Sequence, residues 1–248
     1  MISLSAIIIT FNEEAKIQRC LDSLIPVAEE IVVVDSFSTD QTEAICRRTC
    51  VRFMQHAFNG YVEQIIYAVR QASHPYVLSI DADELLSDTL QQSILSVKQH
   101  WNADGYEMNR SNNYAGRFLR FGGWYPDRKI RLWDVRKGKY GGHNPHYRVI
   151  MEPGASVKRV QGDILHYTFD TVADHVQQAQ RFAVVASARL SGRGRFHNWF
   201  NACSHSFFRL VKCLILKAGF LDGWRGFSAA FIAAWEVFLK YHLAAKRH

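Results

Sequence analysis

Short, uniformly apolar runs alternate with amphipathic segments early in the chain, and this alternation limits the possible fold more than any other feature. Leu4–Thr10, Glu30–Asp35 and residues 76–80 have the length and aliphatic composition of buried strands. Residues 13–24 and 61–72 carry apolar side chains at helical spacing, so helices are expected there. Buried strands that alternate with helices predict an α/β fold with a mostly parallel central sheet flanked by helices.

The pattern changes beyond about residue 103. Four apolar segments separated by Gly- and Pro-rich loops are expected to form an antiparallel extension of the sheet: 108–114, 129–133, 148–151 and 164–169. A helix is expected over 172–190, and the Ser-Gly-Arg-Gly sequence at 191–194 is typical of a linker. We therefore expect one α/β domain over residues 1–190, followed by a helical region over 191–248.

Polar side chains follow the predicted strands at the points where those strands end. Thr10 ends the first strand and Asn12 follows it, Asp35 ends the second, and Asp81 and Asp83 follow a later one. Ligands of parallel α/β sheets bind outside the carboxyl ends of the strands. These side chains are therefore expected to gather at one edge of the sheet and to form a binding site.

Asp81 and Asp83 have the spacing of a cation site. Two carboxylates two residues apart at a strand end can address one hard cation, and their oxygen ligands suit Mg²⁺ or Mn²⁺. A metal that bridges a diphosphate would offset the charge that develops on a leaving nucleotide. About one such pair is expected by chance in a chain of this size, and a solvated, helix-capping turn is the structural alternative. The polar clusters at the two other strand ends favour the metal site.

Cysteine spacing and charge indicate the environment of the chain. The five cysteines include no Cys-x-x-Cys pair, which argues against a zinc site or a disulfide framework and favours free thiols in the cytoplasm. The net charge of +7 is concentrated in residues 185–248, where ten Lys and Arg residues accompany only Asp222 and Glu236 as acids. An anionic partner is expected there, either nucleic acid or a membrane surface.

The C-terminal region is expected to form amphipathic helices. On a helical wheel of residues 206–221, Phe207, Phe208, Leu210, Val211, Leu214, Ile215, Ala218 and Leu221 fall in one arc, and Arg209, Lys212 and Lys217 fall opposite. This arrangement is typical of a helix that lies in the interface of an anionic membrane. A helix that caps the core or forms a dimer contact has the same pattern. Glu236, Lys240 and His242 interrupt the apolar stretch after residue 226, so no transmembrane span is expected.

Three segments resemble the signatures of family 2 glycosyltransferases, which have the GT-A fold. They are Ile-Ile-Ile-Thr-Phe-Asn-Glu-Glu from residue 7, Ile-Val-Val-Val-Asp-Ser-Phe-Ser-Thr-Asp from residue 31 and Leu-Ser-Ile-Asp-Ala-Asp-Glu from residue 78. The likeness covers the whole chain and is closest to the branch of lipopolysaccharide-core glucosyltransferases. Residues 124–132 are similar to the acceptor-side motif of that branch, and residues 219–223 are similar to its C-terminal helical motif.

The resemblance implies an inverting, metal-dependent hexosyltransferase. The donor would be a nucleotide sugar, with a UDP-sugar as the first expectation, and the acceptor a cell-envelope glycan or glycolipid such as lipopolysaccharide core. The cofactor would be a divalent metal, Mg²⁺ or Mn²⁺. The residues expected at the donor nucleotide are Thr10, Asn12, Glu13, Asp35 and Asp81, and those expected at the metal are Asp83 and Asp81.

The resemblance also divides the chain by role. Residues 1–102 would form the nucleotide-sugar-binding half of the GT-A domain, and residues 103–190 the acceptor half. Residues 191–248 would associate with an anionic membrane. The enzyme is therefore expected in the cytoplasm, peripheral on the inner face of the cytoplasmic membrane.

Two positions depart from the family pattern. Relatives usually carry a Lys-Asn or Arg-Asn pair on the third helix to help hold the nucleotide, whereas the matching positions here are Ile65 and Ile66. Apolar side chains cannot replace a cation and an amide, so the donor is held differently or weakly. Relatives place an acid where Tyr147 stands, and a tyrosine of ordinary pKa, about 10, is a poor base. The candidate catalytic bases are therefore His146 and Asp127, although a histidine beside a proline turn also has a structural interpretation.

Aromatic and arginine side chains supply candidate contacts for the substrates. Trp124 and Tyr125 suit stacking on an acceptor sugar, with buried packing as an equally ordinary alternative. Arginine forks suit phosphate oxygens. Arg128 is expected at the acceptor and Arg181 at the donor diphosphate, and Arg131 lies in the same segment as Arg128. Surface salt bridges are the alternative for each arginine.

Other function classes fit the sequence less well. The cations lie on amphipathic helices and no nucleic-acid motif appears, so no nucleic-acid partner is expected. No G-x-G-x-x-G follows the first strand and no P-loop occurs, which disfavours dinucleotide oxidoreductases and P-loop NTPases. A nucleotidyltransferase would also use paired carboxylates, but it would release pyrophosphate. A catalytically impaired relative that binds glycan or nucleotide, or acts as a scaffold, is the remaining alternative, which Ile65, Ile66 and Tyr147 make credible.

Overall fold

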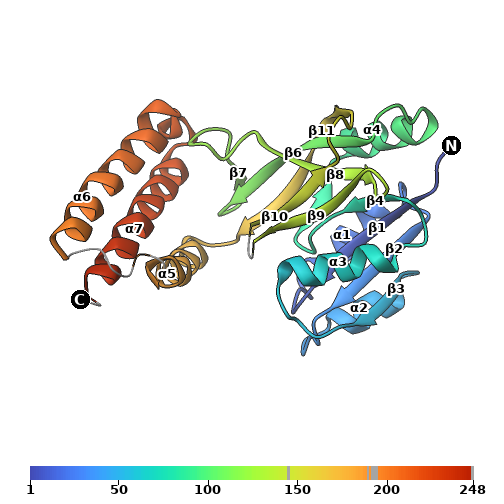
Figure 1. Cartoon of the computed structure of the whole chain (residues 1–248), viewed down its shortest axis with the longest axis horizontal. Helices are drawn as coiled ribbons and strands as arrows, with labels where there is room; N and C mark the ends of the chain where they lie inside the picture. The colour runs from blue at the N-terminus through green and yellow to red at the C-terminus, as the bar shows by residue number, and fades with distance from the viewer. Residues whose placement is uncertain (144–145, 189, 191–194, 247–248) are drawn as a thin grey trace. The chain divides into compact units, whose positions relative to one another are not determined.

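The chain forms two compact units, seen in the computed structural model of Figure 1. The first comprises Met1–Arg110 and Arg128–His166, and the second comprises Ser111–Asp127 and Tyr167–His248. The structure describes residues 1–143, 146–188, 190 and 195–246, without the side chains of residues 143, 146, 195 and 196.

The described residues form a nine-stranded sheet and a separate two-stranded sheet. The strands are β1 (Leu4–Thr10), β2 (Glu30–Asp35), β3 (Arg52–Gln55), β4 (Tyr76–Ser79), β5 (Glu84–Leu86), β6 (Gly105–Tyr114), β7 (Arg117–Phe118), β8 (Asp127–Asp134), β9 (Gly138–His143), β10 (His146–Met151) and β11 (Val157–Phe169). The order across the large sheet is β3-β2-β1-β4-β8-β6-β11-β5, with β7 paired to β6. β9 and β10 form the small sheet.

The early apolar runs build the parallel part of the sheet. β1 pairs in parallel with β2 and with β4, and β2 pairs in parallel with β3. Leu4, Ala6 and Ile8 of β1 pack in one core cluster while Ile7 packs in another, because successive side chains of a strand point to opposite faces. β8 pairs antiparallel with β4, and β5 with β11. The predicted α/β sheet with an antiparallel extension is confirmed.

Helices of the first unit pack in both of these core clusters. α1 (Ile17–Leu24), α2 (Thr42–Arg48) and α4 (Asp88–Gln99) contribute to the cluster of Leu4, and α3 (Tyr61–Gln71) to the cluster of Ile7. Sequence reasoning missed α4, although its start carries an ordinary cap, in which the Ser87 hydroxyl accepts the Leu90 N–H at 3.3 Å.

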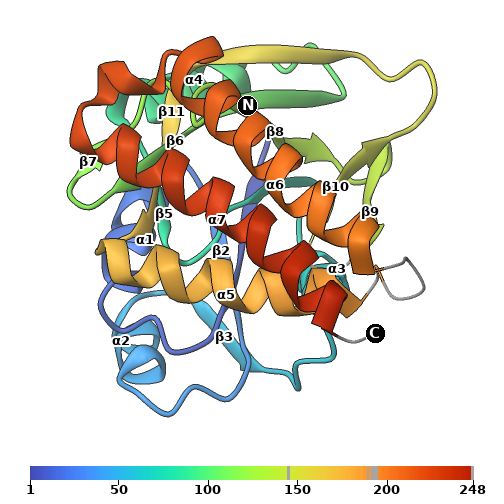
Figure 2. The same ribbon diagram turned by 90° about the vertical axis from the view of Figure 1, so that its left-hand side faces the viewer.

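Helices make up most of the second unit. They are α5 (Val172–Ala188), α6 (Arg195–Val211), the π-helix η1 (Lys212–Leu216), the 3₁₀-helix η2 (Gly219–Asp222) and α7 (Trp224–Lys246). α6 and α7 lie side by side and antiparallel (Figures 1 and 2). Tyr114, Leu119, Phe169 and Ala229 form a buried cluster of this unit. Within the described ranges, no helix has both the length and the apolar character needed to cross a membrane.

The continuous helix expected over residues 206–221 is wrong. Regular α-helix ends at Val211, a π-helical turn follows, and Ala218 takes a left-handed φ of 52° before η2 begins. The chain turns tightly because Gly219 lies against the Cys213 carbonyl, where a Cβ would come within 2.6 Å of the oxygen. A single helical wheel therefore does not describe how the apolar and basic side chains beyond Val211 are arranged.

Candidate active site

Side chains tie together the loops that follow β1 and β2. The strand register places Thr10 opposite Asp35. Asn12 has a left-handed φ of 54°, its Oδ1 accepts the Thr39 N–H at 2.8 Å, and its own N–H donates to Ser38 Oγ at 2.8 Å. Ser38 donates its N–H to the buried Asp35 carboxylate at 2.8 Å. The structure thus brings together the predicted residues at these two strand ends.

Glu13 belongs to the same network through its backbone. Its N–H donates to Thr42 Oγ1 at 2.9 Å, and the Glu14 N–H donates to Asp40 Oδ2 at 3.0 Å. Because these bonds hold residues 13 and 14 against the loop after β2, the chain makes a turn there. Helix α1 consequently begins at Ile17 rather than at residue 13 as predicted.

Asp81 follows β4 and is engaged by two side chains. Its Oδ2 accepts a hydrogen bond from Arg131 Nη2 at 2.7 Å, and its Oδ1 accepts one from the Tyr147 hydroxyl at 3.1 Å. Burial by itself would raise the pKa of Asp81, but the Arg131 guanidinium outweighs burial and lowers the pKa to about 2. The Asp81 carboxylate is therefore charged and held in a fixed direction at the edge of the sheet.

Glu84 stabilises the turn of residues 81–84 from a buried position. Its side chain is fully buried, and its Oε2 accepts the Asp81 N–H at 3.0 Å. Its Oε1 accepts from Arg131 at 3.0 Å and from Arg110 at 3.3 Å. Arg131 on β8 is 5% exposed and bridges both carboxylates. The sequence singled out neither Glu84 nor this ion-pair network, in which the buried Arg131 is matched by the buried Glu84 and the partly exposed Asp81.

Asp83 pairs with a histidine that sequence reasoning missed. Its Oδ2 lies 3.1 Å from His166 Nε2. His166 stands on β11, opposite Glu84 of β5. Nothing in the local sequence around His166 marks it, because the contact arises from the pairing of two strands far apart in the chain. Among the described residues, no group of three or more His, Cys, Asp or Glu side chains is arranged to hold a metal ion.

The position expected to hold a catalytic acid is filled by a hydrogen-bond donor. The Tyr147 hydroxyl donates to Asp81. Burial, followed by the Asp81 charge, raises the pKa of Tyr147 far above its usual range, so the phenol stays protonated. The backbone of His146 pairs with His143 between β10 and β9, but the His146 side chain lies outside the described residues.

The two isoleucines of α3 pack in the core. Ile65 is fully buried, and both Ile65 and Ile66 contribute to the cluster that contains Trp133. The neighbouring Gln64 is buried instead with its amide toward β2, where Nε2 donates to Ser36 Oγ at 3.0 Å. The same amide is also bonded to His56, whose Nδ1 lies 2.8 Å from Gln64 Oε1 and whose backbone oxygen accepts from Nε2 at 3.1 Å. Gln64 therefore links α3 to the loop after β2, a contact that the sequence pattern did not indicate.

Comparison with known families identifies the chain. Residues 5–153 match the family model described as glycosyl transferase family 2. The chain belongs to glycosyl transferase family 2. The resemblance noted in the sequence is thus confirmed, and with it the GT-A assignment of the α/β fold and the presence of a C-terminal helical region.

Curated relatives of this family 2 glycosyltransferase match nearly its whole length. The lipopolysaccharide core biosynthesis glycosyltransferase LpsC of Rhizobium meliloti is 28% identical over 265 residues, covering 98% of this chain and 94% of LpsC. An uncharacterized glycosyltransferase of Rickettsia typhi is 26% identical over 255 residues, covering 97% of this chain and 86% of that protein.

Solved structures match less of the family 2 glycosyltransferase. Staphylococcus aureus TarS matches with a TM-score of 0.43 and 17% identity, over 74% of this chain and 39% of that chain. Glucosyl-3-phosphoglycerate synthase from Mycobacterium tuberculosis, in complex with Mn²⁺, UDP and glucosyl-3-phosphoglycerate, matches with a TM-score of 0.36 and 22% identity. That match covers 46% of this chain and 45% of the synthase chain.

The remaining predicted residues of the glycosyltransferase lie mostly in the second unit. Trp124, Tyr125, Asp127 and Arg181 belong to that unit, and Arg128 belongs to the first. Trp124 packs edge-on against the Tyr114 and Phe169 rings, and the Tyr125 ring lies 4.6 Å from the Arg120 guanidinium. Arg128 and Arg181 are exposed, and Asp127 is partly buried at the start of β8.

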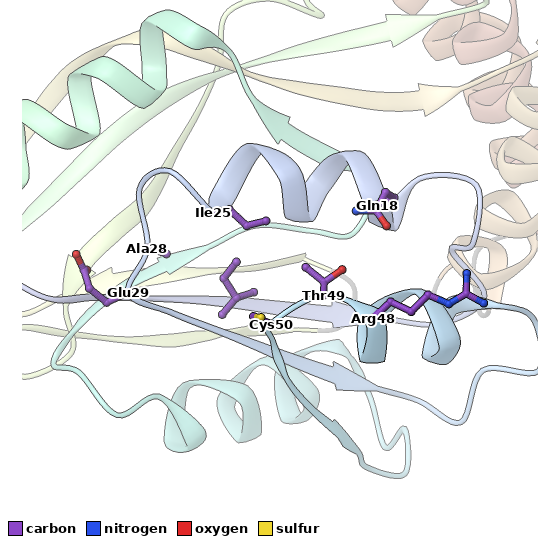
Figure 3. A pocket seen from close by; sticks show the side chains of 8 residues that line it. Gln18, Ile25, Ala28, Glu29, Arg48, Thr49 and Cys50 are labelled. Atoms are coloured by element: carbon purple, nitrogen blue, oxygen red, sulfur yellow. The ribbon is translucent and has the colours of Figure 1, made fainter.

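A hollow of about 470 Å³ on the first unit lies apart from the predicted residues. It is lined by Gln18, Ile25, Ala28, Glu29, Ile31, Arg48, Thr49 and Cys50 (Figure 3). Ile31 is near the start of β2, at the opposite end of that strand from Asp35. None of the predicted site residues lines the hollow, so we place the candidate active site at the strand ends instead.

Proposed function

We propose that this family 2 glycosyltransferase is an inverting hexosyltransferase. It transfers a sugar from a nucleotide-sugar donor, in the first instance a UDP-sugar, to a cell-envelope glycan or glycolipid such as lipopolysaccharide core. The observation that carries the proposal is the ionised Asp81, fixed by Arg131 beside Asp83 at the sheet edge where Thr10 and Asp35 end their strands. Similarity to LpsC over 98% of the chain supports the acceptor class.

The donor nucleotide is proposed to lie along Thr10, Asn12 and Glu13, with its base or ribose at Asp35. The Thr10 hydroxyl is buried and has no hydrogen-bond partner among the described residues. A buried hydroxyl is normally satisfied, so Thr10 suits a contact that only a ligand supplies. The buried amide of Gln64 is bonded to Ser36 and His56, so we propose that the donor is held without a counterpart of the Lys-Asn pair of relatives.

A divalent cation, Mg²⁺ or Mn²⁺, is proposed to bind at Asp83, with His166 as a second protein ligand and Asp81 close by. Asp83 Oδ2 and His166 Nε2 lie 3.1 Å apart, so both side chains would hold the ion, and a carboxylate oxygen is the kind of ligand that suits Mg²⁺ or Mn²⁺. The bound ion would offset the charge that develops on the leaving diphosphate. Asp81 holds the ribose and supports the metal from its fixed position.

The acceptor side is proposed from the remaining predicted residues. Trp124 and Tyr125 contact the acceptor sugar, and Arg128 binds an anionic group on it. Arg181 reaches the donor diphosphate. The proton of the attacking hydroxyl passes to Asp127 or to His146, since the protonated Tyr147 cannot accept it.

The division of the chain is proposed to follow the same roles. Residues 1–102 bind the nucleotide sugar, residues 103–190 bind the acceptor, and residues 191–248 associate with an anionic membrane. The enzyme then works at the cytoplasmic face of the membrane that carries its acceptor, with no nucleic acid as partner.

Calorimetric titration with UDP and GDP, with and without Mn²⁺, tests the donor site. We expect micromolar, metal-dependent binding, roughly −8 kcal/mol, that weakens at least about tenfold in an Asp83→Ala variant. Asp22→Ala, which removes an exposed carboxylate of α1, is the matched control and should bind as the unaltered protein does. Failure of both nucleotides to bind in the presence of Mn²⁺ would refute the proposal.

A catalytically impaired relative is the second candidate, and Tyr147 is the observation that favours it. The hydroxyl of Tyr147 is committed to Asp81, so the position that carries the acid in relatives contributes no base. Metal-dependent UDP binding without release of UDP from a UDP-sugar, in the presence of lipopolysaccharide-core acceptors, would support this second function over the first.

A further inference from the structure

The turn that joins α6 to α7 gathers exposed apolar side chains. We call residues 207–227 the hairpin tip; they include the end of α6, both short helices η1 and η2, and the start of α7. Eight large apolar side chains of the tip are between 43% and 69% exposed: Phe207, Phe208, Ile215, Leu216, Phe220, Leu221, Trp224 and Phe227. Soluble proteins rarely expose so many large apolar side chains together unless the surface binds something.

The backbone of the hairpin tip is closely packed. A Cβ on Gly226 would come within 1.9 Å of the Gly219 carbonyl oxygen, and a Cβ on Gly219 within 2.6 Å of the Cys213 oxygen. The buried Asp222 carboxylate accepts the N–H groups of Arg120 and Phe121, the latter at 2.9 Å. The exposed apolar side chains therefore stand on a fixed scaffold within the second unit.

The exposed charge of the hairpin tip has one sign. Arg209, Lys212, Lys217 and Arg225 are its basic residues, and its one acid, Asp222, is 3% exposed. Exposed apolar side chains with basic residues among them along the segment match an anionic lipid surface, where the acyl chains receive the apolar side chains and the headgroups pair with the cations. A two-fold contact between copies of the chain through this surface would set one basic hairpin tip against another, which like-charge repulsion disfavours.

We propose that the hairpin tip inserts into an anionic lipid surface and is the membrane-binding element of the protein. This inference rests on the membrane association in the proposed function and gives it a location. The contact is made by the closed end of a helix hairpin, whereas the sequence pattern had predicted one helix lying flat in the interface. The aromatic and aliphatic side chains enter the headgroup region, while Lys212 and Lys217 pair with lipid phosphates.

Co-sedimentation of the full chain with vesicles tests the proposal. One set contains phosphatidylcholine alone and the other contains phosphatidylcholine with phosphatidylglycerol. We expect binding to the mixed vesicles that weakens with salt. A Phe207→Ser, Leu216→Ser, Leu221→Ser variant should lose about tenfold or more in partitioning, and a Lys212→Gln, Lys217→Gln variant about fivefold for each lysine.

A matched control removes exposed apolar side chains of the first unit. Ile25 and Val157 are 54% and 42% exposed, and their replacement by Ser should leave vesicle binding unchanged. All variants should bind UDP as the unaltered protein does, which separates failure of this inference from failure of the donor site. Protein that stays in the supernatant with anionic vesicles would overturn the proposal. The proposal would also be overturned if the three serine substitutions in the hairpin tip left vesicle binding intact. The same holds if they dissociated a dimer of the protein without affecting vesicle binding.

Discussion

Replacing Arg131 with methionine should destabilise the first unit strongly. The substitution keeps an apolar chain of similar length in the core but removes the guanidinium that pairs with Asp81 at 2.7 Å and Glu84 at 3.0 Å. Glu84 has no exposed side-chain surface. Among the residues that the structure describes, Glu84 would keep Arg110, at 3.3 Å, as its one charged partner.

The expected cost follows from the burial of each partner. Removing one member of a buried ion pair costs about 3–5 kcal/mol, because a charge is left without compensation. We expect Arg131→Met to lower the free energy of unfolding by about 3 kcal/mol, near the lower end of that range. Arg110 still pairs with Glu84, and the Asp81 side chain is 21% exposed to water. Arg136→Met is the matched control: it breaks an ion pair of the same 2.7 Å with Asp134, but Arg136 is 61% exposed. Exposed pairs contribute about 0–1 kcal/mol.

Urea unfolding followed by tryptophan fluorescence measures both variants. A second variant, Arg131→Met with Glu84→Gln, should recover part of the loss because it also removes the unpaired charge. A free energy of unfolding for Arg131→Met within about 1 kcal/mol of the unaltered protein, and equal to that of Arg136→Met, would refute the reasoning. Water would then have to reach Glu84 in the variant.

The ion pair between Arg131 and Asp81 predicts how the stability of the protein depends on pH. The pKa of Asp81 is lowered to about 2 in the folded protein, so its charge stabilises the fold above the unfolded pKa of about 4. That stability, about 2 kcal/mol, is lost as the pH falls from about 5 toward 2. The loss should be smaller in Arg131→Met, which unfolding curves at pH 7 and at pH 3 would measure.

Three further substitutions test separate parts of the structure. Tyr147→Phe removes a hydrogen bond to Asp81. It should lower the free energy of unfolding by about 1 kcal/mol and leave kcat within about tenfold of the unaltered protein. A loss of kcat near a thousandfold would instead make Tyr147 a catalytic residue. His166→Ala should weaken UDP binding about tenfold or more with Mn²⁺ and leave metal-free binding unchanged; equal affinity in Mn²⁺ would remove His166 from the metal site. Gly226→Ala forces a Cβ to within 1.9 Å of the Gly219 oxygen; it should cost about 2 kcal/mol or more, and an unchanged Tm would contradict the close packing of the hairpin tip.

The sequence predicted the parallel half of the sheet well because burial there has a local signature. β1, β2 and β4 are short apolar runs whose composition alone indicates a covered strand. The first turn of α1 and the course of the chain after Val211 could not be predicted in the same way. The first depends on Thr42 and Asp40 binding the backbone of a distant loop, and the second on close contacts between glycines and carbonyl groups.

The candidate site also has a part that the sequence predicts and a part that depends on the folded sheet. Asp81 and Asp83 follow a recognisable strand, so their position could be predicted. The partners that control them could not, because Arg131 and His166 come from strands that reach β4 and β5 only through the order of the finished sheet. The spacing of residues along the chain carries no information about that order.

The burial of Glu84 limits which substitutions can accumulate in related sequences. Glu84 and Arg131 pair out of contact with water, so a neutral residue at one position removes a charged partner from a buried charge at the other and leaves it with a single partner, Arg110 or Asp81. In a collection of related sequences, positions 84 and 131 should therefore change together, with a neutral residue at one accompanied by a neutral residue at the other. Asp83, which pairs with His166 and takes no part in the ion pair of Glu84 and Arg131, should show no such linkage with position 131.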